Sequence, residues 1–153
     1  MKFSKITLMA MALLVVTPAW GAAKNCKVTV LAVNFGLFDN LNFPVDANGQ
    51  VAVGCAQTGP VTIQIDAGQN SNNSFQPRRM SAAAGQTLNY NLYVDSARTV
   101  VWGDGLTGST QTVVITSGKN NAPATYPIYG RIFSGQAATL GVYSDNIIVS
   151  VIY

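Results

Sequence analysis

The chain has 153 residues, of which nine are Lys or Arg, six are Asp and none is His or Glu. The absence of His removes the Ser-His-Asp and Cys-His arrangements of nucleophilic enzymes and the commonest protein ligand of transition metals. Apart from the adjacent pair Arg78 and Arg79, the basic residues are scattered, and no patch is basic enough to neutralise a phosphate backbone. We therefore expect no nucleic-acid partner, no metal and no cofactor.

Residues 1–23 are predicted to be a secretory signal peptide. Lys2 and Lys5 precede an apolar run, and the small residues that suit signal cleavage follow it. Cleavage after Gly21 and cleavage after Ala23 fit this rule equally well. The apolar run is shorter than the roughly 20 residues that cross a bilayer, so we expect export of the chain and no membrane span.

The remaining part of the chain, residues 24–153, is predicted to be a single domain. Once Lys2 and Lys5 are removed, seven basic residues face six Asp, so its net charge is about +1. It contains both Cys residues of the sequence, Cys26 and Cys55. Because oxidising compartments favour pairing, we predict one disulfide between them. Closing a loop of this length stabilises a fold by about 3 to 4 kcal/mol in the chain-entropy model.

Alternation of apolar and polar residues is the main structural signal along this domain. Strands are predicted, in chain order, at residues 26–35, 50–55, 61–66, 88–95, 100–102, 111–116, 126–133 and 146–153. Turn clusters rich in Gly, Asn, Asp and Pro are predicted at residues 46–49, 58–60, 69–74, 103–105, 117–123 and 134–135. No segment of the domain has a helical period. Short strands at this spacing predict an antiparallel β-sandwich.

Catalysis has little support in the sequence. Asp95 and Asp104 are the nearest pair of carboxylates for acid-base work, but Asp104 lies in a Gly-Asp-Gly turn, where Asp is favoured for its backbone geometry. The Asp residues stand singly, whereas a calcium site needs six to eight oxygen ligands. We predict that the chain is not an enzyme.

Three residues are candidate surface contacts. Arg78 and Arg79 follow a run rich in Asn and Ser and could grip a carboxylate or an acidic glycan, although a basic pair on a loop is more commonly just solvated. Trp102 could stack on a sugar ring, with packing in the core as the main alternative. Together with Tyr93, these residues support a rival interpretation, in which the chain is a stand-alone secreted β-sandwich that binds carbohydrate or a cell surface.

The last predicted strand is apolar on both faces. Ile147, Val149, Val151 and Tyr153 share one face, and Ile148 and Ile152 occupy the other. An ordinary sandwich strand has one polar face, so this strand must be covered on both sides or border a groove that another chain fills. Unpaired apolar strand edges invite pairing by another chain, as in donor-strand complementation of pilus subunits.

The chain resembles the spore coat U domain family, the subunits of archaic, Csu-type chaperone-usher pili. The matching segments run in family order through the mature chain: Cys26, residues 33–39 (VNFGLFD), residues 49–55 (GQVAVGC), Arg79-Met80, residues 88–95, residues 102–105 (WGDG), residues 129–131 (YGR) and residues 141–145 (GVYSD). The resemblance implies an incomplete immunoglobulin-like antiparallel β-sandwich of about seven strands with one donor strand missing. It also implies the Cys26–Cys55 disulfide.

The same resemblance implies a function and partners. The chain would be a structural subunit of a surface pilus that supports adhesion and biofilm formation. Its partners would be a periplasmic chaperone, an outer-membrane usher and other pilus subunits. The groove that accepts the donor strand would include Ile147, Val149, Val151 and Tyr153. Polymerising subunits carry about ten or more alternating residues before the first Cys, whereas here only Lys24 and Asn25, or at most a few more residues, precede Cys26 in the mature chain. We therefore expect a tip or terminal position.

Overall fold

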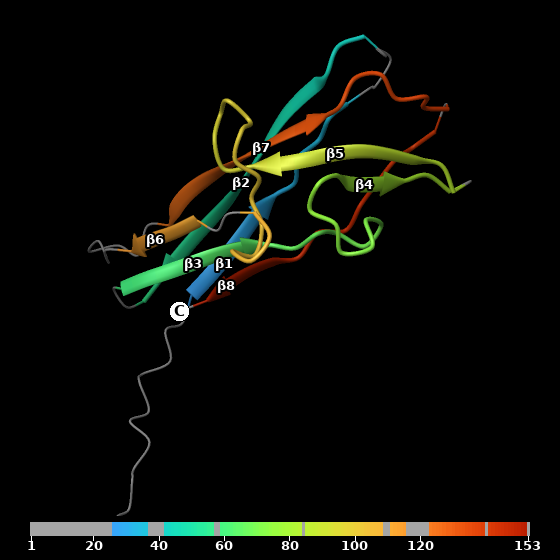
Figure 1. The fold of residues 1–153 in the computed structure, drawn as a ribbon. Coiled ribbons are helices and arrows are strands. Elements are labelled where there is room, and N and C mark those ends of the chain that lie inside the picture. The colour runs from blue at the N-terminus through green and yellow to red at the C-terminus, as the bar shows by residue number, and fades with distance from the viewer. Residues whose placement is uncertain are drawn as a thin grey trace, which may run out of the picture.

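The computed structural model describes residues 26–36, 42–56, 59–83, 85–108, 111–115, 123–139 and 141–152. These residues form eight strands and no helix (Figure 1), and within them no helix is long and apolar enough to cross a membrane. One sheet has five strands, in the order β1 (Cys26–Leu31), β2 (Val45–Cys55), β7 (Ala124–Ile132), β5 (Thr87–Tyr93) and β4 (Arg78–Ser81). The other has three, in the order β6 (Gln111–Ile115), β3 (Gly59–Ile65) and β8 (Val149–Ile152). All neighbouring strands are antiparallel.

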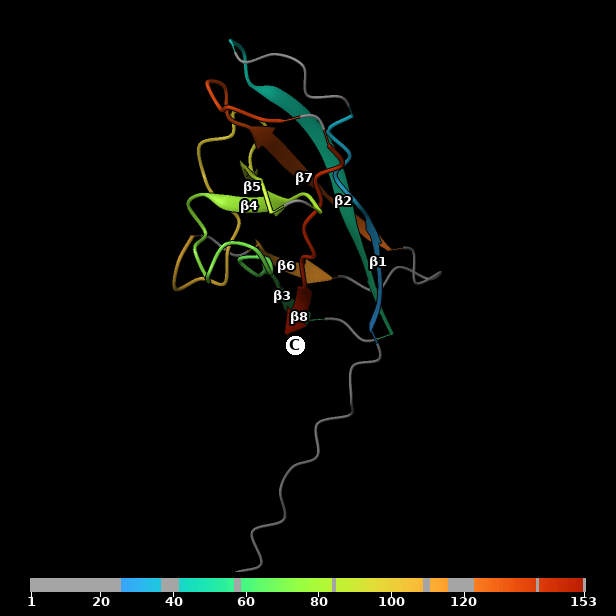
Figure 2. The same cartoon turned by 90° about the vertical axis from the view of Figure 1, so that its right-hand side faces the viewer.

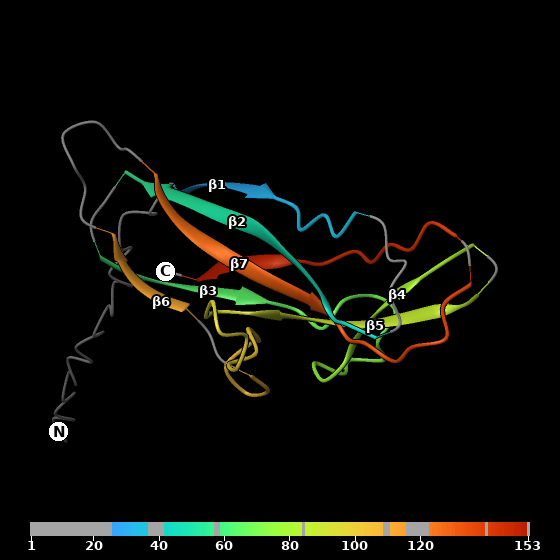
Figure 3. The ribbon, with the colours of Figure 1, turned by 90° about the horizontal axis from the view of Figure 1, so that it is seen from above.

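The two sheets form the layers of a sandwich, which confirms the predicted fold class (Figure 3). Alternation decides which face of each strand is buried: in β3, Val61, Ile63 and Ile65 are buried, and the polar residues between them are half-buried. The core is completed by inward residues of the other strands: Val51, Val53, Cys55, Met80, Leu88, Tyr90, Leu92, Trp102, Ile128 and Ile132.

The disulfide between Cys26 and Cys55 is present, with an S–S distance of 2.05 Å, as predicted. The two residues lie directly opposite one another in the β1–β2 ladder. The bond therefore fastens β1, which is an edge strand, to the long strand β2.

Trp102 links the two sheets. Its backbone amide donates to Leu92 O of β5 at 2.9 Å, and its indole Nε1 donates to Ile63 O of β3 at 3.1 Å. Its neighbour Gly103 accepts a hydrogen bond from Ile65 N of β3 at 3.2 Å. Residues 100–102, predicted to be a strand, form none of the eight strands and pair with β5 only as an isolated bridge, between Tyr93 and Val101.

The predicted turn at residues 46–49 is wrong, because these residues lie inside β2 and pair with β7. Gly49 has a steric role there: a Cβ on it would come within 2.5 Å of Leu31 O and 2.9 Å of Val33 Cγ2. A glycine inside a strand commonly marks such a close approach of another backbone. The same stretch includes Asp46, whose carboxylate accepts two hydrogen bonds from Arg131 on β7, at 2.7 and 2.8 Å.

Candidate functional site

The inner face of β1 is only partly covered. Val28 and Val30 lie directly opposite Val53 and Val51 of β2, and opposite residues of an antiparallel pair point to the same face of a sheet. Val51 and Val53 have no exposed surface, whereas Val28 is 38% and Val30 is 47% exposed. Two valines that face the core thus remain in contact with solvent, which is the signature of a sandwich that lacks a covering element at this edge.

A groove of about 840 Å³ opens next to this face. One wall is formed by residues 30 and 32–36 and the other by residues 138–139, 141–147 and 149, and buried side chains of both sheets form the floor. The floor is almost entirely apolar: Ile65, Met80, Leu88, Tyr90, Leu92, Ile128 and Ile132. β1 and β8 each end their sheet, and neither pairs along its outer edge with another strand of the described chain (Figure 2). The backbone groups of these two edges are therefore available to an additional strand.

The segment that follows β1 lines the groove with Val33 and Phe35. Val33 and Phe35 pack against the backbone of β7 at Gly130. A Cβ on Gly130 would come within 2.7 Å of Val33 Cγ1 and of Phe35 Cζ. The Phe35 ring also meets Tyr90 edge-on, with the ring centroids 6.0 Å apart. Gly49 and Gly130 thus allow this segment to pack into the sandwich instead of continuing β1 along β2.

The last part of the chain switches from one sheet to the other. Ser144 exchanges two backbone hydrogen bonds with Ser81 of β4, at 2.9 and 3.0 Å. A few residues later β8 pairs with β3. Between these contacts, Asp66 Oδ1 accepts a hydrogen bond from Ile148 N at 2.9 Å. The wall of the groove formed by this segment is therefore held at several points.

The predicted groove residues on this segment are distributed as follows. Ile147 and Val149 line the groove and pack against the core. Val151 packs against the core but does not line the groove, and Tyr153 lies outside the described residues. On the opposite face of the segment, Ile148 and Ile152 are more than half exposed.

Asp145 is the single carboxylic acid among the described residues that line the groove. Its Oδ1 accepts hydrogen bonds from Gln69 N at 3.0 Å and from Asn70 Nδ2 at 2.9 Å, and its Oδ2 accepts one from the Tyr90 hydroxyl at 2.8 Å. Burial, and secondarily this hydrogen bond to Asp145, raises the pKa of Tyr90 well above its ordinary value. The Tyr90 hydroxyl therefore stays protonated. Its hydrogen bond to Asp145 holds the groove wall that contains Asp145 against β5.

Sequence reasoning missed the first wall and most of the floor. Val28 and Val30 alternate in the sequence, as do Val33 and Phe35 after a shift of one residue, but alternation shows only which way a side chain points. Whether a facing strand covers that side chain depends on the strand order, which the pattern does not contain.

The prediction that Arg78 is an exposed surface contact is wrong. Arg78 begins β4 and is fully buried. Its guanidinium donates to Asp66 O at 2.7 and 2.9 Å, to Trp102 O at 2.6 Å, to Ile65 O at 3.3 Å and to Asn91 Oδ1 at 2.8 Å. Burial lowers the pKa of Arg78 to about 10, so it remains charged at neutral pH.

Trp102 is also fully buried, which supports core packing and excludes stacking on a sugar in this conformation. Arg79 is half-buried on β4. The rival interpretation, a stand-alone binder that uses Arg78 and Trp102 as contacts, thus loses two of its contact residues.

The candidate catalytic carboxylates have structural roles. Asp95 accepts hydrogen bonds from Thr99 and from Val100 N, and Asp104 accepts from the backbone amides of Leu106 and Thr107. These hydrogen bonds lower the pKa of both carboxyls. Within the described residues, no three His, Cys, Asp or Glu gather into a potential metal site.

Comparisons with known proteins agree with the resemblance. The family model of the Spore Coat Protein U domain matches residues 10–150. Protein U of Myxococcus xanthus is 29% identical over 136 residues, which cover 79% of this chain and 71% of that protein.

A solved structure has a similar fold. It is the crystal structure of the CsuC–CsuE chaperone–tip adhesion subunit pre-assembly complex from archaic chaperone-usher Csu pili of Acinetobacter baumannii. One of its chains matches with a TM-score of 0.59 and 21% identity, over 85% of the present chain and 40% of that chain. This chain thus spans about two fifths of that chain's length, and the likeness shows a shared fold.

Proposed function

The chain belongs to the Spore Coat Protein U domain family, a family of structural, non-enzymatic proteins, and from this premise we propose that it is a subunit of an archaic, Csu-type chaperone-usher pilus. In this proposal another chain completes the sandwich by donor-strand complementation. The assembled pilus supports adhesion and biofilm formation. The prediction that the chain is not an enzyme agrees with the family.

The observation that carries the proposal is the uncovered inner face of β1. Val28 and Val30 face the core but stay 38% and 47% exposed, beside an apolar groove of about 840 Å³. An extended chain that entered the groove could pair with the free edge of β1 or of β8 and bury alternate side chains against the floor. Backbone hydrogen bonds and apolar burial would both favour its insertion.

The proposed partners follow from this chemistry. A periplasmic chaperone would cover the groove after export, and an outer-membrane usher would then exchange it for a strand of another pilus subunit, which places the protein first in the periplasm and then at the cell surface. The similar solved structure is a complex between a chaperone and a subunit, which supports this order. Ile147 and Val149 would contact the inserted strand directly, and Val151 would support it from the core.

A tip or terminal position is the finer part of the proposal. It is supported by the likeness to a complex that contains a tip adhesion subunit. Mass spectrometry of purified fibres tests it: we expect this chain at a small fraction of the copy number of the main subunit. A chain found as the abundant repeat would contradict the terminal position without affecting the proposed complementation.

Expression of residues 24–153 in the periplasm, with and without the chaperone, tests the complementation. We expect the chain alone to aggregate or to be degraded, and the pair to purify as a soluble complex. Val30→Asp should abolish the complex, because a carboxylate would be buried without a partner. Thr29→Asp is the matched control, since Thr29 points to the opposite face of β1 and should retain the complex. Equal soluble yields of the chain with and without the chaperone would overturn the proposal.

A further inference from the structure

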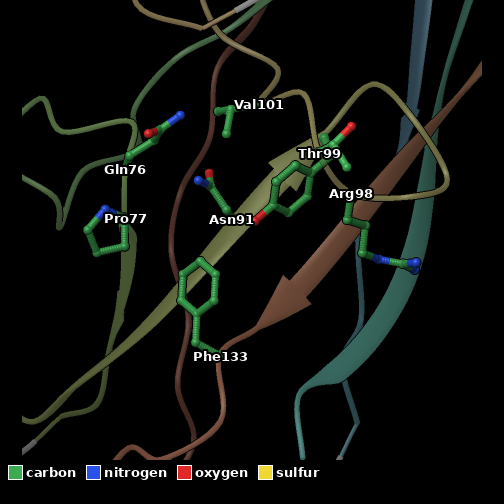
Figure 4. A pocket seen from close by; sticks show the side chains of 8 residues that line it. Gln76, Pro77, Asn91, Arg98, Thr99, Val101 and Phe133 are labelled. Carbon is green, nitrogen blue, oxygen red and sulfur yellow. The ribbon is translucent and has the colours of Figure 1, made fainter.

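A second pocket, of about 450 Å³, lies on the opposite face of the five-stranded sheet. Its floor includes Asn91 and Tyr93 of β5, which alternate with the groove residues Tyr90 and Leu92 and therefore point outward. Its walls come from the loop before β4, the loop after β5 and Phe133 at the end of β7 (Figure 4). The pocket shares no lining residue with the groove.

The floor of the pocket presents a hydrogen-bond donor without a partner. Asn91 Oδ1 accepts two hydrogen bonds, from Arg78 Nη1 at 2.8 Å and from Leu92 N at 3.1 Å. These two donors fix the orientation of the amide, so the NH₂ end points away from Arg78. No described residue accepts a hydrogen bond from Asn91 Nδ2, although the residue as a whole is 2% exposed. Figure 4 shows this side chain near those of Gln76, Pro77 and Val101.

A positive charge lies directly behind this donor. The guanidinium of Arg78 is buried, and all the oxygens that accept its hydrogen bonds are carbonyl or amide oxygens. Its charge is therefore not neutralised by direct contact with a carboxylate. A ligand atom that accepts a hydrogen bond from Asn91 Nδ2 would be favoured further if it carried negative charge.

The remaining lining suits a ring that has hydroxyl groups. Phe133, Tyr93 and Pro77 supply apolar surface. At the rim, the side chain of Gln76 is exposed, and Thr99 Oγ1 donates to Asp95 Oδ2 at 2.9 Å but keeps its own lone pairs as acceptors. The volume lies within the range of small-molecule sites. Apolar surface beneath and polar groups around the rim match the faces and edges of a sugar ring.

We propose that this pocket binds a sugar residue that carries a carboxylate, with the carboxylate accepting a hydrogen bond from Asn91 Nδ2 and the ring lying against Phe133. The site is independent of the groove. A complemented subunit would therefore present it on its surface, where it could contact an acidic polysaccharide. Arg78 acts in this site from below, through Asn91, rather than as an exposed contact.

Saturation-transfer difference NMR with residues 24–153, purified with the chaperone or alone, tests the proposal with sodium D-glucuronate and D-glucose as probes. We expect glucuronate to bind about tenfold or more tightly than glucose. Asn91→Asp keeps an acceptor for Arg78 and hence the fold, but replaces the donor with a negative charge. This variant should weaken glucuronate binding about tenfold or more and leave glucose binding nearly unchanged.

Asn89→Asp is the matched control. Asn89 lies on the same face of β5 as Asn91 but does not line the pocket, and its substitution changes the net charge by the same amount as Asn91→Asp. It should leave glucuronate binding within about threefold of the unmodified chain. Phe133→Ala should weaken both sugars alike. Equal binding of the two sugars, no binding of either, or equal effects of Asn91→Asp and Asn89→Asp would each overturn the proposal.

Discussion

Val30 and Val51 offer the sharpest test of the unfinished sandwich, because they face each other in the ladder but differ in burial. Val51 has no exposed surface, and Val30 is 47% exposed. Val→Thr keeps the β-branched shape and the strand propensity, so its cost comes from burying a hydroxyl without a partner. That cost is about 1 to 3 kcal/mol at a fully buried position and within about 0.5 kcal/mol at a hydrated one.

We therefore expect Val51→Thr to lower the free energy of unfolding of the isolated chain by about 1 to 3 kcal/mol, and Val30→Thr to change it by no more than about 0.5 kcal/mol. Once a donor strand covers β1, the hydroxyl at position 30 is buried as well. Val30→Thr should then weaken donor-strand binding by the same 1 to 3 kcal/mol, which is roughly a fivefold to 150-fold rise in Kd.

Urea unfolding of the isolated chain, refolded in vitro at a low concentration that limits aggregation, gives the first quantity. Fluorescence anisotropy of a labelled donor peptide, taken from the N-terminal extension of a polymerising subunit, gives the second. Equal destabilisation of the isolated chain by both substitutions, with no change in peptide affinity for Val30→Thr, would refute the reasoning that β1 lacks a covering strand.

Three further predictions concern the buried Arg78, the ion pair between Asp46 and Arg131, and the disulfide. Arg78→Met should lower the free energy of unfolding by about 3 kcal/mol or more, because buried carbonyl oxygens lose their donors; an unchanged urea midpoint would contradict this role. The hydrogen bond from Arg131 lowers the pKa of Asp46 below its ordinary value of 3.8, so this pair stabilises the fold above about pH 4, and its contribution is lost as the pH falls through the lower pKa of the folded state. Asp46→Asn should then flatten the fall of the urea midpoint below pH 4, by a modest amount because the pair is partly exposed; an unaltered pH profile would exclude the pair as its source. Replacing Cys26 and Cys55 together with Ser should cost about 3 to 4 kcal/mol, given their separation of 29 residues, and a dithiothreitol-insensitive thermal midpoint of the unmodified chain would contradict it.

The features that the sequence predicts well are local. Alternation at residues 61–66 and 88–95 corresponds to β3 and β5; burial alternates along β3, whereas the last four residues of β5 are all buried. The disulfide was predicted from two Cys residues in a chain that we expect to be exported, and the structure contains it. Each of these signals depends on a few neighbouring residues or on the compartment, so a single sequence is sufficient to carry it.

The misread features depend on contacts between distant segments. Arg78 follows a polar run and suggested an exposed loop, but carbonyl oxygens that lie 12 to 24 residues further away converge on it. Gly49 suggested a turn, whereas it is a glycine because the backbone at Leu31 crosses it closely. The groove was predicted on one wall only, through Ile147 and Val149, since the position of the other wall is set by strand order.

Gly49, which Val33 approaches, and Gly130, which Val33 and Phe35 approach, have a consequence for the register of any inserted strand. Because Gly49 and Gly130 let Val33 and Phe35 lie close to the strand backbone, the ring of Phe35 lines the groove beside Tyr90. An inserted strand cannot enter the space that Val33 and Phe35 occupy, so we expect these two side chains to limit the registers that the strand can adopt along β1.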